Sequence, residues 1–180
     1  MNFSRLKQII TIFAVTFLLT SCSRQLSLSY EPSLDVYASQ PVSLYVIPPD
    51  QDANLTGDPP AKGITIGIIE KDEVSHWAWE ALKGELQRVG YSLKTDGNEA
   101  KYQISLGMVD ITDKKMSLEI SVKEKEELIF IKSYTSTKKT LTLPLYKVFF
   151  GLQRPVNDLF NASLSEIYEQ FIIDLNQVVQ

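Results

Sequence analysis

The single cysteine of the sequence, Cys22, has the side chain whose chemistry is easiest to interpret. Its thiol is a nucleophile, and it follows Leu19-Thr20-Ser21 at the end of an apolar run from Ile9 to Leu19. A charged stub with Arg5 and Lys7 precedes this run, which is the layout of a secretory signal. The run has 11 residues, whereas a helix that spans a membrane needs roughly 20 apolar residues. We therefore expect an export segment that is cleaved.

The string Leu19-Thr20-Ser21-Cys22 looks like a bacterial lipobox. In this motif the cysteine thiol is acylated and the signal, here residues 1–21, is cleaved off just before it. Two or more fatty chains hold a protein stably on a bilayer, at ~0.8 kcal/mol per buried CH₂. Ser23 favours the outer membrane, because an Asp at this position commonly retains Gram-negative lipoproteins in the inner membrane. The alternative is a plain signal peptide with an incidental cysteine.

The remaining polar side chains form no recognisable catalytic or metal-binding set in the sequence. His76 is the one histidine, lies on the polar side of a predicted helix, and is interpreted as a solvated surface residue. Asp50, Asp52 and Asn54 have the spacing that opens a calcium loop, but the later glycine and glutamate of such a loop are missing. We therefore predict no catalytic residue, no metal and no cofactor, and we expect that the protein is not an enzyme.

The charge of the chain disfavours several classes of partner. The sequence has 18 Lys and Arg against 22 Asp and Glu, and cleavage of the signal removes Arg5 and Lys7, which leaves a net charge of −6. A sequence-independent nucleic-acid binder needs basic side chains for the phosphates, and so does a polybasic membrane patch. We expect no nucleic acid as a partner, and contact with the membrane through the lipid on Cys22.

The mature chain has the size of one ordinary domain. Residues 22–40 are polar, contain Pro32 and show no sustained period, so we interpret them as a lipidated N-terminus and a tether. Residues 41–180 are predicted to form a single domain that faces the periplasm.

Alternating apolar residues predict a mainly antiparallel sheet. Strands are expected at residues 42–47, 64–69, 91–94, 102–108, 116–122 and 128–134. The last three are consecutive and each has one polar face, as in an antiparallel meander. In the first of these three, Tyr102, Ile104, Leu106 and Met108 are expected to point to the same side.

The first predicted helix has an apolar stripe from Val74 to Val89 that is interrupted by Glu85, and Gly90 is placed to cap its end. Trp77 and Trp79 are about 200° apart on this helix, so both cannot lie at the centre of one stripe. Either they flank the two edges of a wide buried face, or one ring is an exposed anchor of the kind that dominates interfaces.

The last predicted helix has a continuous apolar stripe from Leu164 to Val179. Ser163 and Glu166 have the spacing of a capping box at its start, although the helix could begin earlier, near Val156. Two amphipathic helices and a one-faced sheet bury each other best in one arrangement. We predict an α+β fold, a two-layer sandwich with both helices on one face of a mainly antiparallel sheet.

Residues Leu143–Leu152 are apolar without a clean period. They either close the core over the sheet edge or contact a partner or a lipid, since exposed apolar patches usually mark interaction sites. Trp79, Tyr146, Phe149 and Phe150 are therefore the candidate interaction surface.

The order of these elements resembles that of the YajG-type outer-membrane lipoproteins. The likeness includes the lipobox, the tether, the helix that ends in Val89-Gly90-Tyr91, the meander and the C-terminal helix, and it is strongest from Trp77 to Val109. The layout is also similar to that of lipoproteins that assist lipopolysaccharide assembly and lipid transport. The resemblance implies an accessory protein that binds another envelope component. No catalytic residue is known in these families, so none is carried over.

We expect a membrane-anchored bacterial lipoprotein that acts as a non-catalytic envelope accessory or protein-interaction module with an envelope protein as partner. The alternative is a lipid- or lipopolysaccharide-transport accessory that contacts acyl chains, with a lipid as ligand. Either protein is expected on the outer membrane, facing the periplasm, and inner-membrane anchoring is the less favoured alternative.

Overall fold

The computed structural model describes residues 28–49, 55–56, 71–111, 115–138 and 153–179. Several predicted features lie outside these ranges, namely the lipobox Leu19-Thr20-Ser21-Cys22, the strand at 64–69, and Tyr146, Phe149 and Phe150.

The described elements follow the predicted order of strands and helices, except that a two-residue strand at 55–56 and a 3₁₀ helix at 97–99 were not predicted. They are β1 (Ser43–Val46), β2 (Leu55–Thr56), α2 (Lys71–Arg88), β3 (Ser92–Leu93), the 3₁₀ helix η1 (Gly97–Glu99), β4 (Tyr102–Ile111), β5 (Met116–Glu124), β6 (Glu127–Thr135) and α4 (Gln153–Val178).

The sheet has the strand order β3-β1-β4-β5-β6, and β2 pairs with β4 beyond the end of β1. The long strands β4, β5 and β6 form the predicted antiparallel meander, in which Ile104 lies opposite Val122 and Val122 opposite Phe130. The short strands β1, β2 and β3 pair in parallel. A parallel pair needs a crossover connection, and α2 lies in the connection between β1 and β3. The sheet is mostly antiparallel, as predicted.

A bulge in β4 changes the side to which its later residues point. The register with β5 shifts between Leu106 and Val109. Val109 is buried whereas Met108 is 43% exposed, so the prediction that Met108 points inward is wrong. Gly107 lies at the bulge, where a Cβ atom would come within 2.8 Å of Oε1 of Glu119. A bulge inserts residues into the alternation, and a strict period of two does not reveal it.

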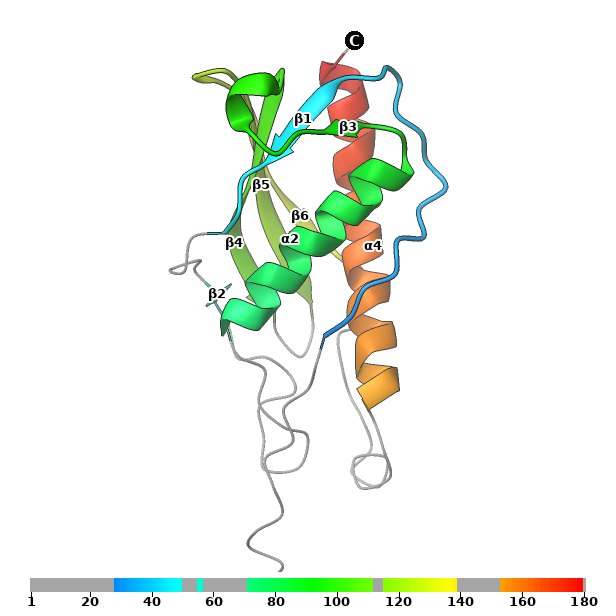
Figure 1. Cartoon of the computed structure of the whole chain (residues 1–180). Coiled ribbons are helices and arrows are strands. Elements are labelled where there is room, and N and C mark those ends of the chain that lie inside the picture. Colours follow the sequence, from blue (N-terminus) through cyan, green and yellow to red (C-terminus); the bar gives the residue numbers. More distant parts are fainter. Residues whose placement is uncertain (1–27, 50–54, 57–70, 112–114, 139–152, 180) are drawn as a thin grey trace, which may run out of the picture.

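Both helices cover the same face of the sheet, which confirms the predicted two-layer α+β sandwich (Figure 1). The helices meet at Trp77 and Phe160, whose ring centroids are 6.1 Å apart. The buried hydroxyl of Tyr168 donates a hydrogen bond to the carbonyl oxygen of Ala78 at 2.5 Å. The core between the layers includes Leu44, Val74, Leu82, Leu86, Ile104, Leu118, Ile120, Val122, Leu164, Ile167, Phe171 and Leu175.

The C-terminus of α2 is capped as predicted. Gly90 has a φ of 104°, a left-handed conformation that favours glycine after a helix. The backbone N–H of Tyr91 donates back to the carbonyl oxygen of Leu86 at 3.0 Å. This cap turns the chain from α2 into β3.

The helix α4 begins before the predicted capping box. It extends from Gln153, so Ser163 lies inside the helix and is buried. The carboxylate of Glu166 accepts hydrogen bonds from the hydroxyls of Ser136 at 2.8 Å and Thr137 at 2.6 Å, just after β6. The capping-box interpretation is wrong, and the earlier start near Val156 was the better alternative.

The tether prediction is wrong for residues 28–40, which pack onto the domain. This segment, here called the strap, runs beside α2 and α4 before it enters β1 (Figure 1). Leu34 is buried, and Leu28, Tyr30 and Val36 are partly buried against the core. The packed part of the chain therefore begins at or before residue 28, and not at residue 41.

Candidate functional site

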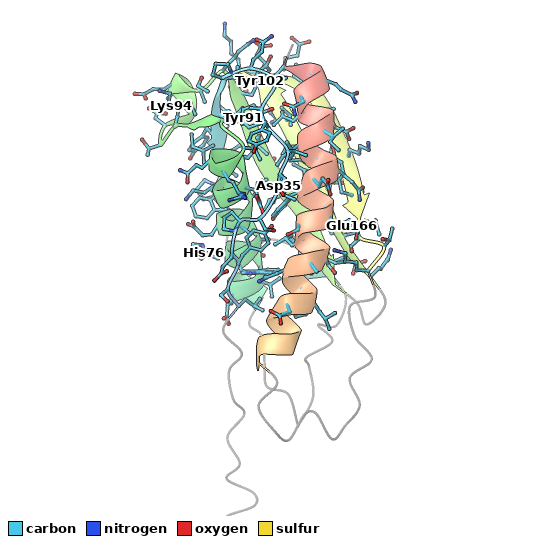
Figure 2. All side chains as sticks on the ribbon, turned by 90° about the vertical axis from the view of Figure 1, so that its right-hand side faces the viewer. Asp35, His76, Tyr91, Lys94, Tyr102 and Glu166 are labelled. Atoms are coloured by element: carbon cyan, nitrogen blue, oxygen red, sulfur yellow. The ribbon has the colours of Figure 1, made fainter. Side chains whose placement is uncertain are left out.

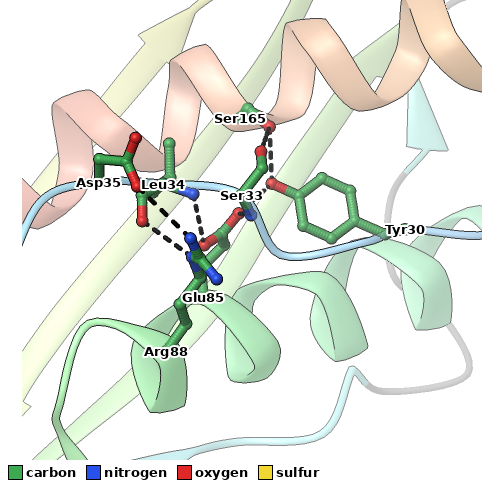
Figure 3. A network of polar contacts seen from close by, with 7 residues as sticks. All are labelled: Tyr30, Ser33, Leu34, Asp35, Glu85, Arg88 and Ser165. Carbon is green, nitrogen blue, oxygen red and sulfur yellow. Dashed lines mark hydrogen bonds and ion pairs between the residues drawn. The ribbon is translucent and has the colours of Figure 1, made fainter.

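The strap is fixed to α2 by the buried carboxylate of Glu85 (Figure 3). Its Oε1 accepts hydrogen bonds from the hydroxyl of Tyr30 at 2.5 Å and from the backbone N–H of Ser33 at 2.9 Å. Its Oε2 accepts from the backbone N–H of Leu34 at 3.3 Å. A buried carboxylate is tolerated where it is hydrogen-bonded, so Glu85 and the strap stabilise each other.

Tyr30 also joins the strap to α4. Its hydroxyl oxygen lies 2.7 Å from Oγ of Ser165, and its ring centroid lies 6.4 Å from that of Tyr168. Burial, reinforced by the hydrogen bond to Glu85, raises the pKa of Tyr30 far above its usual value of about 10. The neutral phenol is therefore held between the two helices.

The second half of α2 contacts the strap closely. A Cβ atom on Gly84 would come within 2.8 Å of Cγ of Pro32, so the close approach of the strap requires glycine at this position. One turn later, Nε of Arg88 donates a hydrogen bond to the carbonyl oxygen of Leu34 at 3.0 Å. The same guanidinium lies 3.4 Å from the carboxylate of exposed Asp35, a pair that contributes little because it is solvated.

Asn176 of α4 holds the far end of the strap. Its Oδ1 accepts hydrogen bonds from the backbone N–H of Ser39 at 2.8 Å and from the hydroxyl of Tyr91 at 2.7 Å. Its Nδ2 donates to the carbonyl oxygen of Tyr37 at 3.0 Å. Burial raises the pKa of Tyr91 to about 12. The strap is thus held at both ends, at Leu28 by Glu73 of α2 and at Ser39 by Asn176 of α4.

A cavity of about 340 Å³, here called the strap cavity, lies between the start of the strap and the first half of α2. Its lining consists of Leu28, Ser29, Tyr30, Pro32, Glu73, His76, Trp77, Glu80 and Ala81. The backbone N–H of Leu28 donates to Oε1 of Glu73 at 3.2 Å, which joins the two walls. His76 is exposed, as predicted, and lies on the side of α2 that is remote from Glu166 (Figure 2).

A second cavity, also of about 340 Å³, lies between α2 and the β1–β3 edge of the sheet. Its lining consists of Tyr45, Val46, Pro48, Trp79, Lys83, Gln87, Leu93, Lys94 and Thr95. The indole Nε1 of Trp79 donates to the carbonyl oxygen of Val46 at 3.1 Å, and Nζ of Lys83 lies 3.9 Å from the ring centroid. Trp77 is buried on the other side, so the two tryptophans flank a wide buried face, the first of the two alternatives. A partner contact through Trp79 stays a prediction.

The network around Glu85 was not predicted from the sequence. The available signal was Glu85 itself, a carboxylate inside an apolar stripe. Its partners come from residues more than fifty positions earlier, in a segment that composition assigns to a tether. The structure brings His76 and Trp79 within 5.4 Å of each other, measured between ring centroids, but they line different cavities.

Two further observations concern only the described part of the chain. There, no three side chains of His, Cys, Asp or Glu are grouped so that they could hold a metal ion. Over the same residues, no helix has the length and the apolar character that crossing a bilayer requires.

Comparison with known proteins identifies likenesses of fold. Neither a protein-family model nor a curated protein sequence matches the chain. The crystal structure of protein XCC0632 from Xanthomonas campestris, described by the family model DUF330, is similar with a TM-score of 0.50 and 9% identity, over 85% of this chain and 95% of that one. The hypothetical protein CT253 from Chlamydia trachomatis has a TM-score of 0.48 and 7% identity, over 77% of this chain and 98% of its own. At such identities the likeness to the DUF330 protein concerns the fold alone, and it agrees with the two-layer α+β architecture.

Proposed function

We propose that this protein is a lipid-anchored bacterial lipoprotein that acts as a non-catalytic accessory or interaction module on the periplasmic side of the outer membrane. The observation that carries the proposal is the string Leu19-Thr20-Ser21-Cys22 directly after an export signal. The resemblance to YajG-type lipoproteins in element order supports the same conclusion. The acidic net charge agrees with a protein partner rather than a nucleic acid.

Because the strap is docked, only a short stretch of chain separates the proposed lipid anchor from the folded domain. Leu28 follows Cys22 by six residues, and an extended chain spans at most ~3.5 Å per residue, so acylated Cys22 would lie within roughly 20 Å of Leu28. The domain would therefore stay close to the bilayer. The starts of the strap, α2 and α4 lie at one end of the molecule (Figure 1), and this end would face the membrane.

The anchor is tested by replacing Cys22 in cells that are fed a labelled fatty acid. We expect the Cys22→Ser protein to remain unprocessed or soluble and to take up no label, because the acylated thiol is gone. The matched variant Ser23→Ala should be labelled and fractionate with the outer membrane like the unaltered chain. Acyl incorporation into Cys22→Ser would remove the basis of the proposed location.

A lipid-transport accessory is the second candidate function. The apolar segment Leu143–Leu152 lies between β6 and α4 in the sequence. The end of β6 and the start of α4 lie at the same end of the molecule as the start of the strap (Figure 1). An anchored domain would carry this segment next to the bilayer, where a contact with acyl chains is available.

Serine replacement of both Phe149 and Phe150 separates the candidates. If the two rings form an interaction surface, the variant should fold, as judged by circular dichroism, and lose the partner in a native pull-down. If they contact lipid, the folded variant should lose lipid that mass spectrometry detects in the unaltered protein. Unfolding of the variant would assign the two rings to the core, because two hydroxyls cannot replace the buried rings.

A further inference from the structure

The second cavity, between α2 and the β1–β3 edge of the sheet, is lined by basic side chains and by no acidic one. It is here called the edge cavity. Its lining includes Lys83 of α2 and Lys94, which follows β3, but no Asp or Glu. The whole chain, in contrast, has more Asp and Glu than Lys and Arg, 22 against 18. The edge cavity is therefore a local site of positive charge on an acidic protein, and it favours an anion as ligand.

The ammonium of Lys83 is accessible to a ligand. Its side chain is 30% exposed, and its Nζ lies 3.2 Å from the carboxylate of Glu80, which is more exposed still and lies outside the lining. Such a solvated ion pair contributes little to stability. An ammonium group has three N–H donors, so Lys83 can pair with a second anion while it contacts Glu80.

Lys94 supplies a second positive charge from the opposite wall. Its backbone N–H donates to the carbonyl oxygen of Leu44 at 2.8 Å, which fixes the residue beside β1. Its side chain forms no ion pair with any residue in the described part of the chain. Figure 2 shows Lys94 on the side of the molecule that is remote from α4. A ligand in the edge cavity would provide the counter-charge for this ammonium.

The wall next to Lys83 is a fixed aromatic ring. The indole Nε1 of Trp79 donates to the carbonyl oxygen of Val46 at 3.1 Å, and Nζ of Lys83 lies 3.9 Å from the ring centroid. The indole thus occupies an acceptor at the edge of β1, so an added strand could not use it, and the cavity suits a small molecule better. Its volume of about 340 Å³ lies at the small end of the range for ligand sites. The lining also includes Tyr45, Pro48 and Leu93.

We propose that the edge cavity binds a small organic anion, in which an oxyanion group is attached to a compact apolar body. Phosphates and carboxylates share this chemistry. The ammonium groups of Lys83 and Lys94 pair with the oxyanion, and the apolar body contacts the ring of Trp79. The hydroxyl of Thr95 and the amide of Gln87 also line the cavity and are further donors. This ligand goes beyond the proposed function, and its binding does not depend on the lipid anchor.

Calorimetric titration of the purified full-length protein in a neutral detergent tests the ligand chemistry. Phenyl phosphate and benzoate are the probes for the two kinds of oxyanion, and we expect saturable binding of at least one. Benzyl alcohol, which has no charge, benzylamine, which is a cation, and inorganic phosphate, which has no apolar body, should each bind at least ten-fold more weakly. Raising NaCl from about 50 mM to about 300 mM should weaken the binding, because salt screens accessible charges. Absence of saturable binding by both oxyanions, or equal binding of benzylamine, would overturn the proposal.

Variants at the two lysines test the location of the ligand. Lys83→Gln and Lys94→Gln should each weaken binding several-fold, and the double variant at least ten-fold. Lys123→Gln, at an exposed residue of β5, is the matched control and should bind as the unaltered chain does. Unchanged affinity in a folded double variant would refute the assignment to this cavity.

Fluorescence gives a second measure of the location that needs no change to either lysine. The chain has two tryptophans, so a folded Trp77→Phe protein reports on Trp79 alone. The emission of Trp79 should change on saturation with the bound oxyanion and keep its value with benzylamine. Cys22→Ser should bind the same probes with unchanged affinity, so a failure of the anchor is distinguishable from a failure of this site.

Discussion

The two helices cover the same sheet face but are stabilised in different ways. The buried side of α4 is apolar at Leu164, Ile167, Phe171 and Leu175, which pack directly on the sheet. The buried side of α2 contains Glu85, and its three hydrogen-bond donors all come from the strap. α4 therefore follows from its own amphipathic pattern, whereas the packing of α2 is complete only when a segment more than fifty residues earlier is docked on it.

This difference links the domain to its N-terminus. A strap that was only a tether would leave Glu85 buried without partners, or exposed on an otherwise apolar face. The observed contacts continue from Leu28 to Ser39 along both helices. If Cys22 is acylated as proposed, the chain between the lipid and the folded domain is therefore short, and the anchor orients the domain as well as retaining it.

The largest loss of stability is expected when the apolar packing of α4 is disrupted. Phe171 is fully buried, and its ring centroid lies 5.8 Å from that of Tyr134 and 6.3 Å from that of Phe130. Phe171→Ala should lower the free energy of unfolding by about 3–5 kcal/mol, because it leaves a cavity. Denaturant titration measures this loss. Ile173→Ala, at a residue 46% exposed on the same helix, is the control and should change stability little. Equal stability of the two variants would mean that α4 is not docked.

For Glu85→Leu, the sequence alone predicts a gain in stability, whereas the structure predicts a loss. Completing the apolar stripe with Glu85→Leu should stabilise α2 if the strap is free. With the strap docked, the backbone N–H groups of Ser33 and Leu34 lose their acceptor, and unpaired donors cost about 1–3 kcal/mol. We expect destabilisation of that size and faster hydrogen exchange at Leu34. Glu80→Leu, on the exposed side of α2, is the control. A more stable Glu85→Leu protein would contradict the docked strap.

The sequence predicts those parts of the fold that depend on residues close to one another along the chain. The meander, the stripe of α4 and the cap at Gly90 follow from local periods and turn chemistry. The docking of the strap does not, because its partners for Glu85 are mainly backbone N–H groups, which every sequence contains. The bulge that exposes Met108 could not be predicted either. The alternation of apolar and polar residues continues in the sequence through the position where the register of β4 shifts. Of the candidate site residues, Trp79 could be placed by helical geometry, but the strap cavity required tertiary contacts.

The third prediction uses Gly84, where α2 and the strap approach most closely. In a free helix, Gly84→Ala should stabilise by about 1 kcal/mol. Against the docked strap, the new Cβ would meet Cγ of Pro32 at 2.8 Å, so we expect a loss of about 1 kcal/mol. Thermal or denaturant unfolding shows whether Gly84→Ala raises or lowers the stability. The double variant with Pro32→Ala should recover stability, because the colliding ring is removed, and the coupling isolates this contact. Independent effects of the two substitutions would show that the contact is absent.

The smallest change in stability is expected at Glu166, whose carboxylate joins α4 to the end of β6. Its role is like that of Glu85, which joins α2 to the strap, but Glu166 lies nearer to solvent. Burial alone would raise the pKa of Glu166, but hydrogen bonds from Thr137 and Ser136 and the charge of Lys138 outweigh it and hold the pKa below its usual value. A lowered native pKa stabilises the fold above the unfolded value of about 4.3, and this contribution is lost as the pH falls through the native pKa. Glu166→Gln should therefore cost about 0.5 kcal/mol at pH 7, and the difference from the unaltered protein should become smaller as the pH is lowered toward 3. Denaturant titrations at both pH values measure it, with exposed Glu169→Gln as the control. A difference that stays constant with pH would show that the hydrogen bonds to Glu166 do not depend on its charge.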